Sequence, residues 1–261
     1  FNYHNFNGDE KFSLEACKKA DQTKGFDLHK GSQMRLTVLE LNNNTYEFIW
    51  SFHHILMDGW CLGILIQEFF QIYYSLIQGK LPELNKIYPY STYIQWLSKT
   101  DQKSLLNYWK NYLIGYDTIS TIPKLPTKQE QKEYDHNELN FTLNKSTRQG
   151  IKELCGELGI TENTFVQTVW GILMSKYNNT NDVVFGAVVS GRPGEIEGIE
   201  EMIGLFINTI PVRIQAKEGT TVKELLKEVQ QNTIESTPHH YSQLASIQSQ
   251  TELGRNLFDH I

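Results

Sequence analysis

The chain has 261 residues, of which 39% are hydrophobic and 12% aromatic. This is enough apolar material for one large domain or for two lobes with cores of their own, and it excludes a disordered chain. The formal net charge is −6 and the lysines are scattered, so we expect no nucleic-acid-binding surface. Three cysteines without a C-x-x-C pair, and the lack of an apolar leader, indicate a protein of the reducing cytoplasm.

The longest apolar stretch, Trp60 to Ile77, is interrupted by a glutamate and two glutamines. We therefore expect a helix that is too polar to span a membrane. The sequence opens with Phe1 and ends in NLFDHI, a run that is typical of the start of a strand. We expect the chain to be a piece of a longer protein.

Two alternating segments predict a pair of strands. Met34 to Leu41 alternates in part, an Asn-rich turn follows, and residues 46–54, YEFIWSFHH, alternate strongly. Because side chains alternate across a pleated strand, His53 and His54 are expected to point to opposite faces of the sheet.

The apolar period changes after the histidines. From Trp60 the apolar residues recur at helical spacing, and Gly79 ends the predicted helix. Asp58 and Gly59 therefore lie at a strand-to-helix junction. Two further helices, each with a tryptophan on an apolar stripe, are predicted at Thr92–Leu97 and Lys103–Leu113.

A polar segment, residues 116–136, follows neither period, which predicts a connection between two lobes formed by residues 1–115 and 137–261. The second lobe is predicted to contain a strand at Glu138–Leu143, a helix capped by Ser146 and ending near Gly159, a helix at Glu162–Tyr177, strands in DVVFGAVVSGRP and GLFINTIPVRIQ, and a helix at Val222–Thr233.

The stretch SFHHILMDGW, residues 51–60, gathers two histidines, a carboxylate and a glycine at the junction. A buried histidine is most often a core residue bonded to the backbone. Here Gly59 permits another group to approach the backbone closely. A buried Asp58 carboxylate requires a partner for its charge, and strand-to-helix junctions often carry functional sites. The stretch therefore favours a histidine that accepts a proton from an attacking amine or hydroxyl.

Two other kinds of site are less favoured. A zinc site needs further ligands, for which His239, His240 and His260 are the candidates, and adjacent strand histidines diverge. A nucleophilic serine lacks the G-x-S-x-G pattern, and Cys61 is expected to pack in the core. We expect no metal.

Six segments between Phe26 and Ile261 form an ordered set: FDLHKGSQMRL, HHILMDGW, YSTYIQWL, VVSGRP, IGLFINTIPVR and GRNLFDHI. Together they resemble the condensation domains of nonribosomal peptide synthetases, whose signature is H-H-x-x-x-D-G and whose fold is related to that of chloramphenicol acetyltransferase. The resemblance implies an α/β (α+β) fold of two lobes, each a mixed sheet with helices, with the active site in the channel between them. The R-H-x-x-L-R segment of the family and the end of its second lobe are absent from this sequence.

The resemblance makes His54 the catalytic histidine and His53 its structural neighbour. It implies that Asp58 is structural and forms an ion pair across the lobes with Arg192, which would satisfy a carboxylate at a dry junction. The alternative is that Arg192 is solvated after its strand.

Five further residues are assigned by the same resemblance. The backbone N–H of Gly59 is expected to face the developing oxyanion, and Trp109 is expected to be structural. Asn208 and Trp60 are placed along the substrate channel, although Asn208 is equally well explained as a hydrogen-bonding residue at a strand end. Cys61 stands where the family often has serine, and this difference is expected to be tolerated.

The implied activity is peptide-bond formation between two substrates held on the phosphopantetheine arms of carrier proteins, beside an adenylation domain and with no cofactor bound by the domain itself. Within the resemblance, the sequence Asp58-Gly59-Trp60 favours an L-configured donor and an L-configured acceptor. Two alternatives stay open, namely a stand-alone acyltransferase that uses coenzyme A thioesters and a non-catalytic domain that recruits other enzymes.

Overall fold

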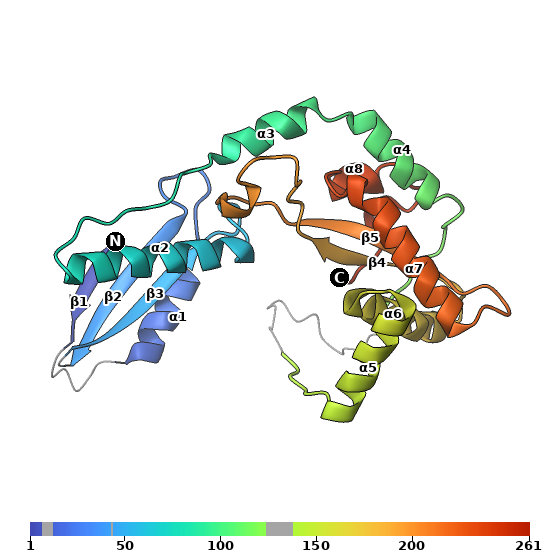
Figure 1. Cartoon of the computed structure of the whole chain (residues 1–261), viewed down its shortest axis with the longest axis horizontal. Coiled ribbons are helices and arrows are strands. Elements are labelled where there is room, and N and C mark those ends of the chain that lie inside the picture. The colour runs from blue at the N-terminus through green and yellow to red at the C-terminus, as the bar shows by residue number, and fades with distance from the viewer. Residues whose placement is uncertain (7–12, 43, 124–137) are drawn as a thin grey trace. The chain divides into compact units, whose positions relative to one another are not determined.

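The computed structural model describes residues 1–6, 13–42, 44–123 and 138–261 (Figure 1). The described chain divides into two compact units. The first consists of Phe1–Trp96 and Arg192–Phe206, and the second of Leu97–Gly191 and Ile207–Ile261. The first unit thus ends before the boundary expected at residue 115, because the helix after Trp96 packs within the second unit. Most of the expected connection, from residue 124 onward, lies outside the described residues.

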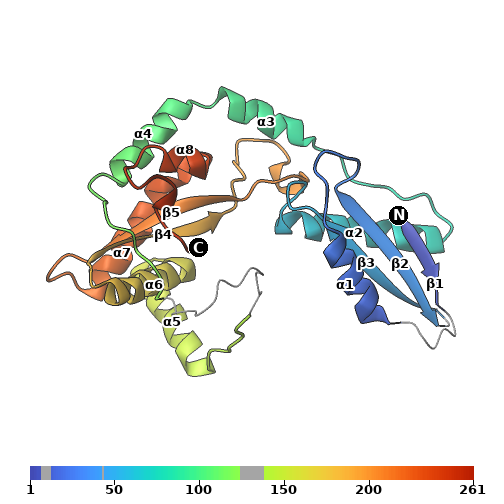
Figure 2. The ribbon, with the colours of Figure 1, turned by 180° about the vertical axis from the view of Figure 1, so that it is seen from behind.

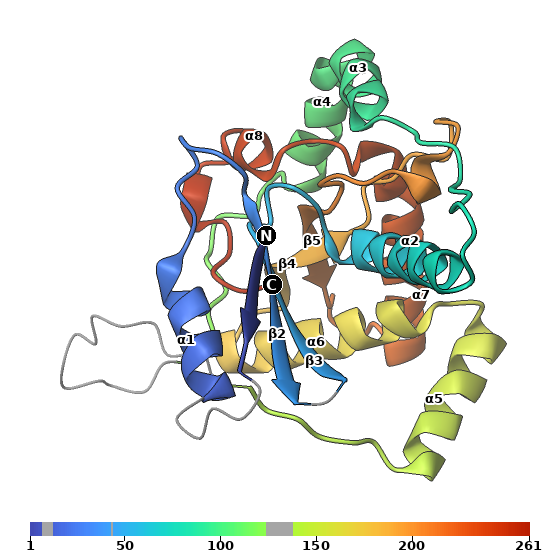
Figure 3. The ribbon, with the colours of Figure 1, turned by 90° about the vertical axis from the view of Figure 1, so that its left-hand side faces the viewer.

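A three-stranded sheet with a helix on each face is the framework of the first unit. Its elements are β1 (Asn2–Asn5), α1 (Leu14–Lys24), β2 (Met34–Asn42), β3 (Thr45–Phe52), α2 (Gly59–Ile77) and most of α3 (Tyr90–Lys99). β1 is parallel to β2 and β2 is antiparallel to β3, so the sheet is mixed, as expected. Figures 2 and 3 show α1 and α2 on opposite faces of this sheet.

Alternation along β3 assigns its side chains to these two helices. Phe48 meets Phe69 of α2 with the ring centroids 5.9 Å apart. On the other face, the Ser51 hydroxyl donates to Asp21 of α1. Arg35, the partner of Ser51 across β2 and β3, donates through Nε to the same carboxylate at 3.0 Å. The hydrogen bonds from Arg35 lower the pKa of Asp21, so α1 is docked on the sheet by a charged pair.

Helix α2 is 19 residues long and, by length and composition, meets the minimum for a helix that crosses a membrane. This differs from the expectation that its polar residues exclude such a role. One helix of this kind is weak evidence, because the core helices of water-soluble proteins have the same length and composition. Its apolar side chains are largely exposed in the described part of the chain.

Helices pack against an antiparallel pair of strands in the second unit. Its elements are α4 (Gln102–Tyr112), α5 (Lys145–Leu158), α6 (Glu162–Asn178), β4 (Asp182–Val189), β5 (Asn208–Gln215), α7 (Val222–Ser236) and α8 (Leu244–Gln248). Within the described residues the sheet has two antiparallel strands, so the mixed sheet expected here is not found. Gly171 lets α6 approach β5 closely, since a Cβ there would lie 2.4 Å from Ile214 Cγ1.

Two details of the second unit correct the sequence predictions. Residues 138–143 form no strand, and Phe141 is 79% exposed. An alternating pattern forms a strand when its backbone has a neighbour to bond, and in the described sheet β4 and β5 bond to each other. The cap of α5 is Asn144 and not Ser146, because Asn144 Oδ1 accepts the N–H of Thr147 at 2.8 Å and the Ser146 hydroxyl at 2.7 Å.

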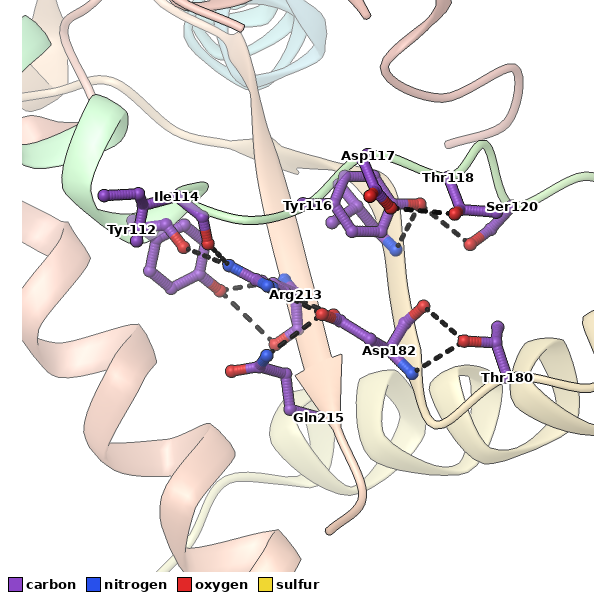
Figure 4. A network of polar contacts seen from close by, with 11 residues as sticks. Tyr112, Ile114, Tyr116, Asp117, Thr118, Ser120, Thr180, Asp182, Arg213 and Gln215 are labelled. Atoms are coloured by element: carbon purple, nitrogen blue, oxygen red, sulfur yellow. Dashed lines mark hydrogen bonds and ion pairs between the residues drawn. The ribbon is translucent and has the colours of Figure 1, made fainter. Parts of the chain in front are cut away.

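A buried arginine joins α4 to both strands of this sheet (Figure 4). Arg213 of β5 forms an ion pair with Asp182 of β4, with Nη2 2.6 Å from Oδ2. Its Nη1 donates to the carbonyl oxygens of Tyr112 and Ile114, at 3.0 and 2.9 Å. The hydrogen bonds with Asp182 raise the pKa of Arg213. The end of α4 is therefore fixed to the sheet by a charged side chain with several acceptors.

Candidate active site

The two histidines lie in the turn between β3 and α2. Contrary to the prediction, β3 ends at Phe52, so strand alternation does not set their directions. The N–H of His53 donates to the carbonyl of Gln33 at 2.9 Å. His53 Nδ1 accepts the N–H of Ile55 at 3.1 Å, and its carbonyl accepts the N–H of Leu56 at 3.1 Å. The His53 side chain is thus bound by its own turn, which supports a structural role.

His54 differs from its neighbour in its surroundings. The side chain is exposed, although the apolar flanking sequence suggested burial. It makes no hydrogen bond or ion pair with any residue in the described ranges. The buried apolar residue at the end of this turn is Met57, which has no exposed surface. His54 is therefore free to bind another molecule.

Asp58 is buried, with 1% of its surface exposed. Its Oδ1 lies 3.5 Å from Nη2 of Arg192 and its Oδ2 accepts the N–H of Phe206 at 3.0 Å. Its own N–H donates to the carbonyl of Gly204 at 3.2 Å, and Cys61 Sγ lies 3.4 Å from Oδ1. We call Asp58, Cys61, Arg192, Gly204 and Phe206 the Asp58 cluster. It holds the start of α2 against residues 202–206.

Arg192 is as deeply buried as its partner, with 2% of its side chain exposed. It stacks on the ring of Phe206, with Cζ 3.9 Å from the centroid, and Nη1 donates to the carbonyl oxygens of Ile199 and Met202. A buried charge is tolerated when it is paired and hydrogen-bonded, as here. The predicted ion pair of Asp58 and Arg192 is present, and both residues belong to the first unit instead of facing each other across two lobes.

No side chain of the described residues caps the first turn of α2. Asp58 occupies the N-cap position but its carboxylate bonds elsewhere in the cluster. In the described chain the N–H of Gly59 has no hydrogen-bond partner, and this residue is exposed. Trp60 is 56% exposed, and its Nε1 donates to the carbonyl of Glu200 at 3.0 Å. An unpaired N–H at a helix start is suited to binding a negative charge.

The two remaining predicted residues lie in the second unit. Trp109 is fully buried and its Nε1 donates to the carbonyl of His239 at 3.0 Å, which confirms its place in the core. Asn208 donates to the carbonyl oxygens of His240 and Ser242, at 2.8 and 2.5 Å. These contacts support the interpretation of Asn208 as a hydrogen-bonding residue at a strand end.

The other histidines considered as metal ligands have different partners. His239 stacks on Tyr108 with the ring centroids 4.0 Å apart. His240 Nε2 lies 3.1 Å from the Ser236 hydroxyl, and burial lowers its pKa to about 4. Across the ranges that the structure covers, no three His, Cys, Asp or Glu side chains are grouped so that they could hold a metal ion.

The sequence did not point to residues 199–202, and although the segment IGLFINTIPVR contains residues 203–206, it did not indicate their contacts with Asp58 or the polar contacts of Cys61. Gly204 and Phe206 contribute backbone groups to the Asp58 cluster, and a backbone contact leaves no mark in the type of side chain. Cys61 was expected to fill the core, and it is indeed fully buried. The polar contacts of its sulfur are seen only in the structure.

Comparison with known proteins identifies the family. The family described as "Condensation domain" matches residues 2–261. The chain is 44% identical to Gramicidin S synthase 2 of Brevibacillus brevis, over 95% of the chain and 6% of that protein. It is 41% identical to Bacitracin synthase 3 of Bacillus licheniformis, over 97% of the chain and 4% of that protein.

Solved structures agree in fold. The first condensation domain of the CDA synthetase has a TM-score of 0.67 at 14% identity, with 93% of this chain and 55% of that chain covered. The X-domain from teicoplanin biosynthesis has a TM-score of 0.74 at 18% identity, with 95% and 58% covered. The chain belongs to the condensation-domain family and has the α/β fold of its structural neighbours. It spans a small part of the synthases and little more than half of the solved domains that it matches.

Proposed function

We propose that the chain is part of a domain that forms peptide bonds in nonribosomal peptide synthesis, with its two compact units belonging to the two lobes. The observation that carries the proposal is the turn at His54. An exposed histidine with no other partner in the described chain precedes an uncapped helix start, and the buried Asp58 cluster holds both in place. A rigid support with free polar groups at its surface is what a positioned catalytic site requires.

The proposed reaction is the attack of an α-amine on a thioester. The amine of the acceptor adds to the carbonyl carbon of the donor, and the tetrahedral intermediate releases the donor's thiol. His54 receives the proton of the amine or holds the amine by a hydrogen bond. Base catalysis contributes about 10²- to 10⁴-fold. Because an α-amine has a pKa of about 8 and is partly neutral already, orientation contributes at least as much.

Gly59 supplies the complementary part of the proposal. The oxygen of the tetrahedral intermediate carries a negative charge, and a fixed backbone N–H stabilises it without reorganising. The N–H of Gly59 at the start of α2, which has no partner in the described chain, supports this role. We assign Trp60, which is exposed beside it, to the substrate channel.

The substrates we propose are an acyl or peptidyl donor and an aminoacyl acceptor, both L-configured and both carried on phosphopantetheine arms. The partners are then the donor and acceptor carrier proteins and a neighbouring adenylation domain in the cytoplasm. A four-domain nonribosomal peptide synthetase is among the matching structures, with 19% of that chain covered, which supports such neighbours. No cofactor of the domain itself is part of the proposal.

The test is a single-turnover assay on the full-length protein, with donor and acceptor loaded on separate carrier proteins and the dipeptide detected by mass spectrometry. Wild type is expected to form the dipeptide, and His54→Ala, which removes an exposed side chain, is expected to fold and to lose at least about 100-fold in rate. His53→Ala is the matched control and is expected to lower stability through its turn.

Each other outcome has a definite meaning. An unchanged rate in His54→Ala would refute the proposed role of this histidine. Turnover of free amines with coenzyme A thioesters would favour the stand-alone acyltransferase. No product from folded wild type would favour the recruitment domain.

A further inference from the structure

The thiol of Cys61 is a member of the Asp58 cluster with polar contacts on several sides. Its Sγ lies 3.4 Å from Oδ1 of Asp58 and 3.5 Å from Nη2 of Arg192. It also lies 3.3 Å from the carbonyl oxygen of Gly204 and 3.4 Å from its amide nitrogen. The residue has no exposed surface. A thiol that only filled space would not contact both members of an ion pair and both polar groups of one glycine.

The position of these contacts in the chain connects them to the candidate site. Asp58 and Cys61 flank Gly59, and both bind Gly204. The first turn of α2 is thereby attached at each end to the same point of residues 202–206. The N–H of Gly59, to which no described residue bonds, lies between the two attachments, and the turn that carries His54 runs directly into Asp58.

We propose that Cys61 is a positioning residue for the condensation reaction. Its sulfur sets the distance between the start of α2 and Gly204, and it holds the Asp58 carboxylate and the Arg192 guanidinium in their places. The direction of the Gly59 N–H and the placement of His54 follow from that distance. The inference rests on the proposed function, because the groups that Cys61 positions are those assigned to amide formation.

Sulfur suits this place because of its size. Hydrogen bonds between hydroxyl groups and oxygen acceptors are about 2.5 to 3.0 Å long, whereas the contacts of Cys61 with oxygen and nitrogen atoms run from 3.3 Å to Gly204 O to 3.8 Å to Met202 O. A serine has the shorter C–O bond and the smaller atom, so it reaches fewer of these groups at once. An alanine reaches none and leaves two buried charges with fewer partners.

The test compares Cys61→Ala and Cys61→Ser in the full-length protein, with Cys155→Ala as the matched control. Cys155 is also buried, but it lies in α5 of the second unit, where its Sγ contacts the carbonyl of Thr161 at 3.8 Å. The readouts are the melting temperature, kcat, and KM for the carrier-bound acceptor. The values of kcat and KM are determined separately. If Cys61 only stabilises the fold, a variant that remains folded should have both constants unchanged.

We expect kcat of Cys61→Ala to fall on the order of 100-fold with KM within about threefold, since small displacements of reacting groups have this effect. Cys61→Ser is expected to recover part of the loss, with kcat still several-fold but at most about tenfold below wild type, and Cys155→Ala to match wild type. A folded Cys61→Ala with wild-type kcat would overturn the proposal. If that variant does not fold, Cys61→Ser decides, and a wild-type kcat for it would overturn the proposal.

The two proposals fail separately. If the wild type forms no dipeptide from carrier-bound substrates, the proposed function is wrong. If the wild type is active and the Cys61 variants are as active, the function stands and the positioning role of Cys61 is wrong.

Discussion

His53 and His54 are neighbours in the chain, yet one is held by its own turn and the other is bound to nothing in the described residues. The difference arises from the turn itself. His53 Nδ1 accepts the N–H of Ile55, so its ring folds back over the backbone, while the next side chain is left at the surface. Of two identical neighbouring residues, one is therefore held by its own turn and the other is exposed and unbound in the described chain.

Gly59 permits a test at the same scale. Its backbone is not in the left-handed region, and a Cβ there would meet no atom within 4 Å in the described structure. Alanine is also the better helix former, by up to about 1 kcal/mol. We expect Gly59→Ala to keep or raise the melting temperature and to slow dipeptide formation at least about tenfold, because a methyl group blocks close approach to the N–H.

Gly63→Ala is the control for this prediction. Gly63 lies in the same helix, one turn later, and a Cβ there also meets nothing within 4 Å. This variant is expected to be as active as wild type in the dipeptide assay. Equal rates for the two variants would show that the N–H of Gly59 is not approached by substrate.

The docking of α1 on the sheet gives a prediction at the scale of elements. Arg35 holds the pKa of Asp21 below its value in the unfolded chain, so the unfolded state binds the proton more readily. The stabilisation from this pair is complete above about pH 4, the unfolded pKa, and it is lost as the pH falls through the folded pKa. Asp21→Asn is expected to cost about 1 kcal/mol at neutral pH and less at acidic pH.

Urea unfolding of wild type and Asp21→Asn at a series of pH values between about 3 and 7 measures this difference. The two curves of unfolding free energy should converge toward the acidic end. A constant difference over the whole range would mean that Asp21 stabilises α1 through its shape and not through its charge.

Elements with a local signal were predicted well from the sequence, and those that depend on partners were not. The apolar period and the left-handed Gly79 predict α2 and its end, and the structure confirms both. Alternation at residues 138–143 is equally regular, but no strand forms there. The cap of α5 was misplaced by two residues, because Ser146 and Asn144 are both good caps and their mutual hydrogen bond selects Asn144.

At the scale of the whole molecule, the first unit is assembled from two separate parts of the chain. Arg192 lies in the second of these parts and neutralises Asp58 in the first. We expect Arg192→Met, which keeps the bulk of the side chain, to lower stability by about 3 to 5 kcal/mol, since it leaves a buried carboxylate without its cation.

Hydrogen exchange locates this effect. Protection should fall at the start of α2 and stay unchanged in α7, which is part of the second unit. The control is Arg255→Met, at an exposed arginine of the second unit. This variant is expected to change neither the stability nor the hydrogen-exchange protection of the start of α2. Equal losses of protection in both units would contradict a role confined to the first.

For the candidate site, the sequence therefore predicted several of the residues but not the contacts that hold them together. The pattern of His54, Asp58 and Gly59, with Arg192 as the partner of Asp58, was available from ordered motifs in the sequence. The sequence did not show which unit each residue joins, because the chain has no special composition where it passes from one unit to the other. Gly204 and Phe206 lie in the segment IGLFINTIPVR, but nothing in the sequence shows that their backbone groups complete the cluster.

The divided first unit also governs how the protein is made. Synthesis adds about 5 to 20 residues per second, so Asp58 leaves the ribosome on the order of ten seconds before Arg192 and Phe206 exist to bind it. During that interval the carboxylate lacks the Arg192 guanidinium and the N–H of Phe206. The second unit is thus partly translated before the first can close its core.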